Sequence, residues 1–339
     1  MSSAHAVDSH FATPVRLLVT GGAGYIGSIV AARLLTVGHE VVVLDNLEQG
    51  HRAAVAPNAP LVVADVLDGD ATRAALADGF DGVLHFAALA LVGESVAHPE
   101  RYYRTNVGGT LNLLEAMRAA GVERLVFSST CAVYGQPEQV PIPESATPRP
   151  TNPYGASKLA ADQMIGDFCR AHGLGAVSLR YFNVAGATDG LGEDHEPETH
   201  LIPNILKVAL GTKPVLEMFG TDYPTPDGTA IRDYIHIEDL AEAHLLALEG
   251  TREREHRIFN LGNGNGFSVR EVIAAAAAVT GNEIPTREAP RRPGDPPMLV
   301  AAADKIRDEL GWRARKPSIE RMVADAWAFA QVHPAGYSQ

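Results

Sequence analysis

Residues 20–27 read TGGAGYIG and follow the apolar run Val15 to Val19. The run is typical of a short buried strand, and the amphipathic sequence after the turn, closed by Gly38, predicts a helix. A strand, a tight turn and a helix open a nucleotide-binding βαβ unit, in which a pyrophosphate lies against the unpaired N–H groups of the helix N-terminus. A purely conformational turn also explains the spacing Gly-x-x-Gly-x-x-Gly, formed by Gly21, Gly24 and Gly27.

The next apolar run, Glu40 to Leu44, ends in Asp45. A carboxylate at the tip of the second strand accepts hydrogen bonds from the ribose hydroxyls of an adenine nucleotide, and its charge repels a 2′-phosphate. The order of strand, turn, helix, strand and acid therefore favours a dinucleotide site over a simple glycine turn. It also favours NAD over NADP as the cofactor.

Composition excludes several classes of protein. The chain has 339 residues and a formal net charge of −13, so a nucleic acid or an anionic membrane is not expected as a partner. Its two cysteines, Cys131 and Cys169, are too few for a disulfide framework and fit a reducing cytoplasm. No apolar stretch is long enough to span a bilayer. Residues 1–14 lack the features of a signal peptide and are predicted to be a disordered tail.

The expected strands and helices alternate as far as residue 187, which predicts an α/β fold with a doubly wound, parallel Rossmann-type sheet. Further strands are expected at 61–64, 82–88, 124–128 and 176–181, and one uninterrupted helix at 99–120. Its predicted core face carries Tyr103, Val107, Leu111, Leu114 and Met117.

Past Gly186 the alternation stops, and residues 189–199 are a polar segment. We assign residues 15–187 to an NAD-binding domain and residues 188–334 to a smaller C-terminal substrate-binding domain. Segments within 229–262 are expected to return to the large sheet, because an alternating run there is followed by a helix and another strand.

Tyr154 and Lys158 lie four residues apart on a predicted helix and therefore share a face. A phenol is a poor base at neutral pH, but a neighbouring ammonium and a positive nicotinamide ring lower its pKa. Thr130, at the end of an adjacent strand, can offer a hydroxyl to the same substrate oxygen. The pattern Tyr-x-x-x-Lys is common on solvated helix faces, and it indicates catalysis here because it follows a dinucleotide turn.

Several longer motifs carry a resemblance to a known family: TGGAGYIG (20–27), HFAA (85–88), NPYGASK (152–158), RYFN (180–183), DYPTPDGTAIRDYIHIEDLA (222–241), NLGNG (260–264) and RRPGD (291–295). In them the chain resembles the extended short-chain dehydrogenase/reductases, and within these the UDP-hexose 4-epimerases. The resemblance implies interconversion of UDP-glucose and UDP-galactose by transient oxidation at carbon 4, with NAD held throughout. It also implies a homodimer that pairs through the two long helices.

The resemblance implies roles for individual residues. Tyr154 is expected as the base, Lys158 as its modulator and a ligand of the cofactor ribose, and Thr130 as the hydroxyl partner. Residues expected at the substrate, besides Thr130 and Tyr154, are Asn183, His200, Leu201, Phe219, Arg232, Arg292, Asp295 and Leu299. Residues expected at the cofactor are Gly21, Gly24, Tyr25, Ile26, Gly27, Asp45, Asn46, Asp65, Val66, Phe86, Ala87, Ala88, Asn106, Ser128, Tyr154, Lys158 and Tyr181. No metal is expected.

Three positions depart from the family pattern. Ala90 stands where family members frequently have a lysine, which removes one polar cofactor contact. His200 stands in place of a substrate-side asparagine. Leu299 stands in place of an aromatic residue that borders carbon 2 of the sugar, so N-acetylated UDP-sugars come within the expected substrate range.

Three alternative functions stay open at this point. A nucleotide-sugar 4,6-dehydratase needs an acid and a base just after Thr130, where Cys131 and Ala132 stand instead. A UDP-glucuronate epimerase or decarboxylase needs a basic residue for the sugar carboxylate, and none can be assigned. A non-catalytic NAD-binding module does not require the intact set of Thr130, Tyr154 and Lys158.

Overall fold

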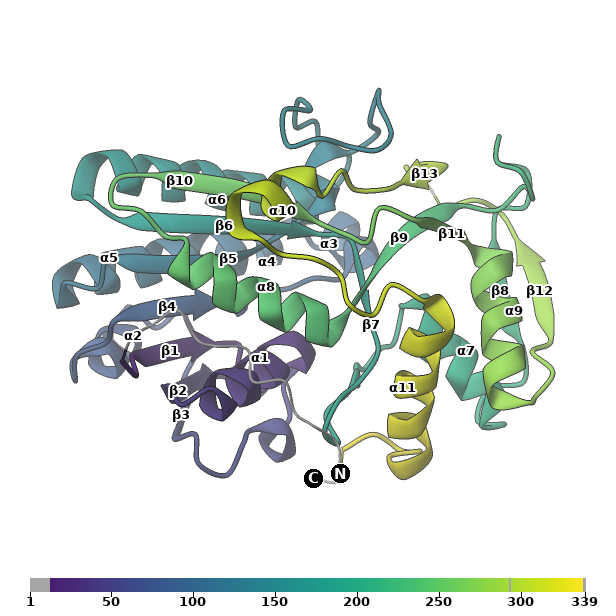
Figure 1. Ribbon diagram of the computed structural model, residues 1–339, viewed down its shortest axis with the longest axis horizontal. Helices are drawn as coiled ribbons and strands as arrows, with labels where there is room; N and C mark the ends of the chain where they lie inside the picture. Colours follow the sequence, from purple (N-terminus) through teal and green to yellow (C-terminus); the bar gives the residue numbers. More distant parts are fainter. Residues whose placement is uncertain (1–12, 293, 338–339) are drawn as a thin grey trace.

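A seven-stranded parallel sheet forms the centre of the computed structural model, which describes residues 13–292 and 294–337 (Figure 1). The strands lie in the order β10-β6-β5-β4-β1-β2-β3, so the order reverses beside β1 and creates the switch point where such sheets bind ligands. Their bounds are β1 Arg16–Thr20, β2 Glu40–Asp45, β3 Leu61–Val63, β4 Gly82–His85, β5 Arg124–Thr130, β6 Gly175–Tyr181 and β10 His256–Leu261. The predicted doubly wound fold is confirmed, and the predicted disordered tail falls almost entirely outside the described residues.

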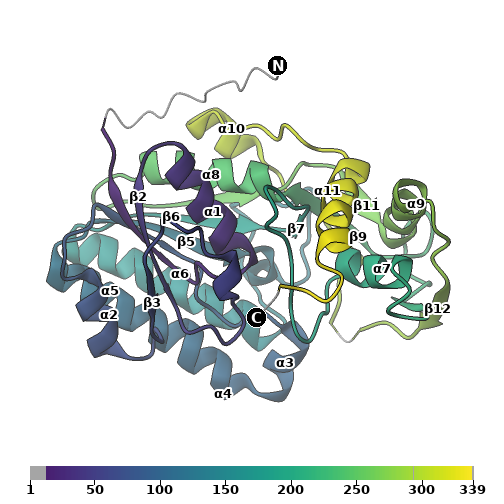
Figure 2. The ribbon, with the colours of Figure 1, turned by 90° about the horizontal axis from the view of Figure 1, so that it is seen from below.

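Helices cover both faces of this sheet (Figure 2). One face packs against α1 (Tyr25–Thr36), α8 (Ile237–Glu249) and α10 (Asp304–Leu310), and the other against α2 (Gly69–Leu76), α5 (Thr110–Ala120) and α6 (Pro153–His172). The strands are continuously apolar because both of their faces are buried in this way. Within the described part of the chain, no helix combines the length and the apolar character that crossing a membrane requires.

The helix predicted at 99–120 is interrupted. It consists of α4 (Pro99–Tyr102), a π-helical turn (Tyr103–Gly109) and α5. The wider turn changes the phase of the helix, so a single period of 3.6 residues finds the inner face only in part. Leu114 and Met117 are buried as predicted, whereas Tyr103 and Leu111 are 47% and 38% exposed and Tyr102 and Leu113 are buried beside them.

A smaller part of the molecule follows β6 and lies to the right in Figure 1. Its elements are the sheet β11 (Gly266–Ser268), β9 (Ile231–His236), β13 (Met298–Leu299) and β7 (Asn183–Ala185), the pair β8 (Leu216–Phe219) and β12 (Thr286–Ala289), and the helices α7 (Leu201–Ala209), α9 (Val269–Thr280) and α11 (Ile319–Val332). Because β7 begins two residues after β6 ends, the carboxyl edge of the large sheet faces this part.

The chain returns from the smaller part to the large sheet. After β9, α8 packs on α1, and β10 then pairs in parallel with β6 from His256 to Leu261. We propose the domain limits 15–187 and 188–334 with this return included, since α8 and β10 share the core of the large sheet.

Candidate active site

Two glycines of the turn after β1 are required by the packing of the chain itself. Gly21 has φ +70°, and a Cβ there would lie 2.5 Å from the backbone nitrogen of Ala87. A Cβ on Gly27 would lie 2.2 Å from the carbonyl oxygen of Gly21. The turn therefore packs directly against both the start of α1 and the segment after β4.

Gly24 has no such requirement, because a Cβ there would meet nothing closer than 3.4 Å. It is the N-cap residue of α1, and no side chain caps that helix. An uncapped helix N-terminus reached over a glycine is the arrangement that holds a pyrophosphate. The residues present therefore fit NAD, whose diphosphate would be held by Gly24 and the backbone of Tyr25, Ile26 and Gly27.

Asp45 fixes the same turn. One carboxylate oxygen accepts the N–H of Ala23 at 2.9 Å and the other accepts the N–H of Leu47 at 2.8 Å. Burial raises the pKa of the Asp45 carboxyl, and these two bonds oppose the shift. Beside it, the Asn46 amide donates to Asp65 at 3.0 Å. Asp45, Asn46 and Asp65, all predicted at the cofactor, thus lie at the carboxyl ends of the neighbouring strands β2 and β3, and Val66 beside Asp65 is buried.

The strand predicted at 82–88 ends at His85. It ends there because the N–H groups of Phe86 and Ala87 both bind the carbonyl of Thr20, at 2.9 and 3.1 Å. Phe86, Ala87 and Ala88 therefore form a loop beside the glycine turn. Asn106, inside the π-helical turn, holds the continuation of this loop through the backbone N–H and carbonyl of Leu89, at 2.8 and 3.0 Å.

Lys158 lies where α6 crosses the end of β5. Its ammonium donates to the carbonyl of Ser128 at 2.9 Å, and the side chain is buried. Burial lowers the pKa of Lys158 to about 8, and the charge of Asp162 opposes this shift. The hydroxyls of Ser128 and Tyr181 are hydrogen-bonded to each other. Three residues predicted at the cofactor therefore meet at the carboxyl edge of the sheet.

Tyr154 lies one helical turn before Lys158, and its phenol is close enough to Thr130 for that side chain to lower the pKa of Tyr154. Its ring meets the buried Tyr102 edge-on, with centroids 6.4 Å apart. Burial raises the pKa of Tyr154 to about 12, and the nearby Thr130 side chain opposes this shift. The lowering expected from Lys158 is thus absent in the chain by itself, and a positively charged cofactor ring has to provide it.

The residues predicted at the nucleotide sugar meet in two pairs. Arg232 on β9 forms an ion pair with Asp295, and the Arg292 guanidinium lies 4.3 Å above the centre of the Phe219 ring. Leu299 is opposite Arg232 in the register of β13 and β9.

The charge of Arg232 also opposes the rise that burial causes in the pKa of Cys131, the neighbour of Thr130. Arg232 is therefore close to the strand end that carries the catalytic set.

Three further predicted residues lie where the smaller part begins. Asn183 starts β7 opposite Tyr234, and Leu201 starts α7. His200 is the N-cap residue of α7, and its Nδ1 lies 2.7 Å from Glu193 and 3.0 Å from Glu198. The carboxylates raise the pKa of His200, with Glu193 the largest cause. Its contact with substrate remains a prediction.

A family model described as the NAD dependent epimerase/dehydratase family matches residues 17–262. The chain belongs to this family. It is 58% identical over 324 residues to a UDP-glucose 4-epimerase of Streptomyces lividans, which covers 95% of this chain and 98% of the relative.

Solved structures show the same relationship. The UDP-glucose 4-epimerase of Brucella ovis in complex with NAD is 44% identical, with a TM-score of 0.89 over 93% of this chain and 98% of that one. The enzyme of Bifidobacterium longum in complex with NAD+ and UDP is 38% identical, with a TM-score of 0.91 over 95% and 100% of the two chains.

Sequence reasoning about this epimerase-family chain missed a buried polar network behind the catalytic set. Asp162 accepts hydrogen bonds from Ser129 at 3.1 Å and from the Arg180 guanidinium at 2.9 and 3.1 Å. Arg180 also donates to the hydroxyl of Tyr134, which donates to Asn260. The network links α6 to the ends of β5, β6 and β10, so it positions Lys158 and Thr130. The only local signal of this network in the sequence was a charged residue inside an apolar strand, Arg180, and another on the inward face of a helix, Asp162.

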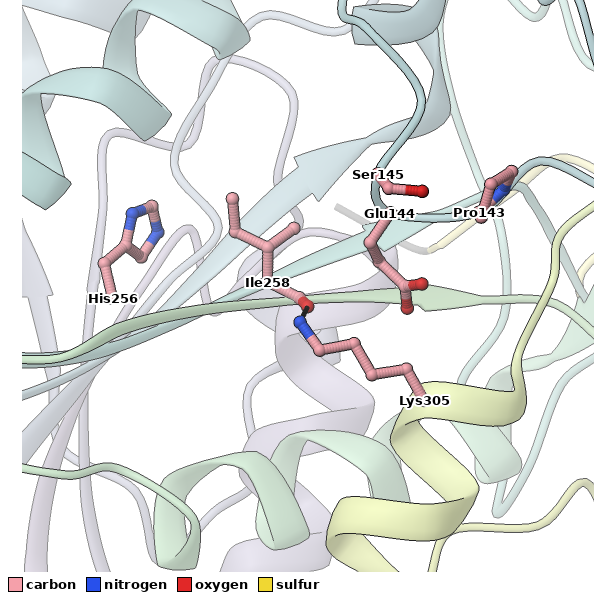
Figure 3. A pocket seen from close by; sticks show the side chains of 6 residues that line it. All are labelled: Pro143, Glu144, Ser145, His256, Ile258 and Lys305. Atoms are coloured by element: carbon pink, nitrogen blue, oxygen red, sulfur yellow. Dashed lines mark hydrogen bonds between the residues drawn. The ribbon is translucent and has the colours of Figure 1, made fainter.

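A surface hollow elsewhere on this epimerase-family chain contains none of the predicted site residues. It lies beside the edge strand β10 and is lined by Pro143, Glu144, Ser145, His256, Ile258 and Lys305 (Figure 3). Lys305 spans it and donates to the carbonyl of Ile258 at 2.9 Å. We place the active site at the carboxyl edge of the sheet instead, because the glycine turn and the residues with shifted pKa values meet there.

Proposed function

We propose that this chain interconverts UDP-glucose and UDP-galactose by inverting carbon 4 of the sugar, with NAD as a tightly held cofactor. The observation that carries the proposal is the placement of Tyr154, Thr130 and Lys158 beside a glycine turn that fits a dinucleotide. Relatives named UDP-glucose 4-epimerase align with almost the whole chain, which supports the choice of substrate.

Each of the three residues has a separate role in the proposed reaction. The Tyr154 phenol takes the proton of the sugar 4-hydroxyl and later returns it, while the Thr130 hydroxyl holds the same oxygen in place. Lys158 keeps a positive charge next to this proton transfer, fixed on the Ser128 carbonyl. Bound NAD would supply the acceptor for the hydride of carbon 4 and its donor when the hydride returns to the opposite face of the sugar ring.

The nucleotide end of the substrate needs cationic side chains. Arg232 and Arg292 lie on neighbouring strands and loops of the smaller part and suit the two phosphates, because a guanidinium fork matches phosphate oxygens. Their partners Asp295 and Phe219 hold them in place before substrate arrives. Binding the sugar mainly through its nucleotide leaves the hexose free to present either face.

The direct experiment is incubation of the purified chain with UDP-galactose and no added NAD, followed by identification of the product. UDP-glucose is expected. A product that has lost water would favour the 4,6-dehydratase. A protein that binds NAD but converts neither sugar would favour the non-catalytic module.

Asp45→Asn should make the chain accept NADP. The substitution keeps an oxygen for the Ala23 N–H and removes the charge that repels a 2′-phosphate, so the NADP to NAD affinity ratio should rise ~10²-fold. Titration calorimetry of both nucleotides after removal of the bound cofactor measures it. Asp70→Asn is the control, since it removes an equal charge from an exposed position on α2. An unchanged ratio in Asp45→Asn contradicts the assigned role.

We also propose a homodimer that pairs through α5 and α6. The exposed Tyr103 and Leu111 leave large apolar surface next to these helices. Light scattering should give twice the chain mass for the wild type, and Leu111→Asp should shift it toward the monomer. Val332→Asp places the same charge on an exposed apolar position of α11 and should stay dimeric. A monomeric wild type rejects the proposal.

We propose the cytoplasm as the location of the enzyme, because Cys131 and Cys169 are both free thiols. Cell fractionation with an antibody to the chain tests this, and recovery outside the soluble fraction contradicts it.

A further inference from the structure

Four potential metal ligands lie together in the segment that joins β7 to α7. We call them the His–Glu cluster: Glu193, His195, Glu198 and His200. One ligand atom of each lies within 4.8 Å of the others. The Nδ1 atoms of both imidazoles face the two carboxylates, at 3.2 and 3.8 Å for His195 and at 2.7 and 3.0 Å for His200. Sequence analysis treated this segment as a polar connection and predicted no metal.

The spacing suits a small tetrahedral cation. Zinc bonds of 2.0–2.2 Å to imidazole nitrogen and carboxylate oxygen place neighbouring donors about 3.3–3.6 Å apart. The four nitrogen–oxygen distances in the cluster range from 2.7 to 3.8 Å, which brackets that separation. Two imidazoles and two carboxylates suit first-row divalent cations, whereas Mg²⁺ and Ca²⁺ prefer oxygen donors alone.

His195 supplies a second, independent observation. Its Nδ1 atom is buried and forms no hydrogen bond, although Glu193 Oε1 lies 3.2 Å away. The nitrogen faces the Glu193 and Glu198 carboxylates at ion-pair distance, but neither contact has the geometry of a hydrogen bond. A buried polar atom without a hydrogen bond is costly, and a cation between this nitrogen and the carboxylates would coordinate it.

We propose that the His–Glu cluster binds one divalent first-row cation, with Zn²⁺ as the preferred ion. Four protein ligands fill a tetrahedral shell, so the site is structural and has no position left for substrate activation. The proposal stands on these four side chains alone and does not depend on the proposed function.

The surroundings show what such an ion would hold in place. The segment begins at Gly186, whose carbonyl accepts the Tyr25 hydroxyl at 2.6 Å, and Tyr25 is the first residue of α1 in the cofactor turn. Next to the cluster, Asp194 lies 3.4 Å from His51 and accepts the backbone N–H of Tyr337 at 2.8 Å. A cation here would fix the segment that joins β7 to α7 and contacts the cofactor turn through Tyr25.

The test measures Zn²⁺ binding to the full chain without a histidine tag, after dialysis against a chelator. Titration calorimetry should show one equivalent for the wild type. His195→Gln and Glu198→Gln should weaken binding ~100-fold or more, because each removes a ligand from a closed shell. His98→Gln is the matched control, since His98 faces Glu100 at 3.8 Å as an isolated exposed pair. Mg²⁺ should give no heat at the same concentrations.

A second measurement covers the case in which a variant does not fold. Crystals of the wild-type chain grown with Zn²⁺ should show an anomalous peak among the four side chains at the zinc absorption edge. Zn²⁺ should also raise the melting temperature of the wild type and of His98→Gln, but not of His195→Gln. A wild type without stoichiometric binding, or a peak located elsewhere, overturns the proposal and leaves a cluster of imidazolium–carboxylate ion pairs.

Discussion

Tyr154→Phe should lower kcat for UDP-galactose about 10²–10⁴-fold, the usual effect of removing a positioned general base. The variant loses only the hydroxyl beside Thr130, and the ring keeps its edge-on contact with Tyr102. The fold and the affinity for UDP should therefore change little. Initial rates and UDP titration on the same preparation separate the two effects.

The matched control is Tyr103→Phe, which removes a hydroxyl from an exposed tyrosine next to Tyr102. It should keep the wild-type rate. If Tyr154→Phe keeps ~10% of the wild-type rate or more, the loss is smaller than that of a general base, and another group takes the proton. Because the free chain holds the pKa of Tyr154 at about 12, the phenol needs the bound cofactor to become reactive at neutral pH. The residual rate of the variant should therefore also depend less on pH.

Local signals were enough for the nucleotide half of the fold. The strand, glycine turn, helix and Asp45 lie within about one βαβ unit, so their order in the sequence is also their order in space. That Tyr154 and Lys158 share one face of α6 could be predicted for the same reason, since residues four apart along a helix lie on one face, whereas their catalytic role stays a prediction. The parallel sheet then followed from the alternation of elements.

Local signals failed where the backbone departs from regular geometry. The π-helical turn Tyr103–Gly109 breaks the period of the helix, so Tyr103 and Leu111 were wrongly placed in the core, while Leu114 and Met117 beyond the turn were placed correctly. β4 ended early because two N–H groups converge on the Thr20 carbonyl, a contact between segments that are far apart in the chain. Neither feature has a residue signature that a periodic pattern can detect.

Pairs that are distant in sequence were the other limit. Arg232 and Asp295 were each predicted at the substrate, but nothing local predicted that they bind each other. Asp162 was not identified and Arg180 was quoted only within the motif RYFN, because a charged residue inside an apolar element gives no indication of its partner. The His–Glu cluster has its four ligands within eight residues, and only the folded loop shows that they converge.

The substrate range depends on Leu299. This residue lies on β13 opposite Arg232 and packs on an apolar cluster that includes Val133 and Phe182. Where the resembling family has an aromatic residue, its ring takes the space that an acetamido group at carbon 2 would need. Leucine is shorter, so we expect the chain to act on UDP-N-acetylgalactosamine as well as UDP-galactose. His200 does not fill this space through its Nδ1 side, which faces Glu193 and Glu198.

Leu299→Tyr should restore the exclusion. It should lower kcat/KM for UDP-N-acetylgalactosamine relative to UDP-galactose by about 10–200-fold, the range that pocket size alone can supply. The larger ring also presses on the apolar cluster and costs about 1–3 kcal/mol of stability. That cost affects both substrates equally, so the ratio measured on one preparation reports the pocket and not the fold.

Met298→Tyr is the control, because it adds a side chain of the same size that points away from the face of β13 that carries Leu299. Met298 is the neighbour of Leu299 on the same strand, so its side chain points to the opposite face, and the ratio should stay at the wild-type value. A wild type without activity on the acetylated sugar would show that other side chains already fill the space. An equal fall of the ratio in both tyrosine variants would mean that a distorted β13, and not the side chain of Leu299, sets the substrate range.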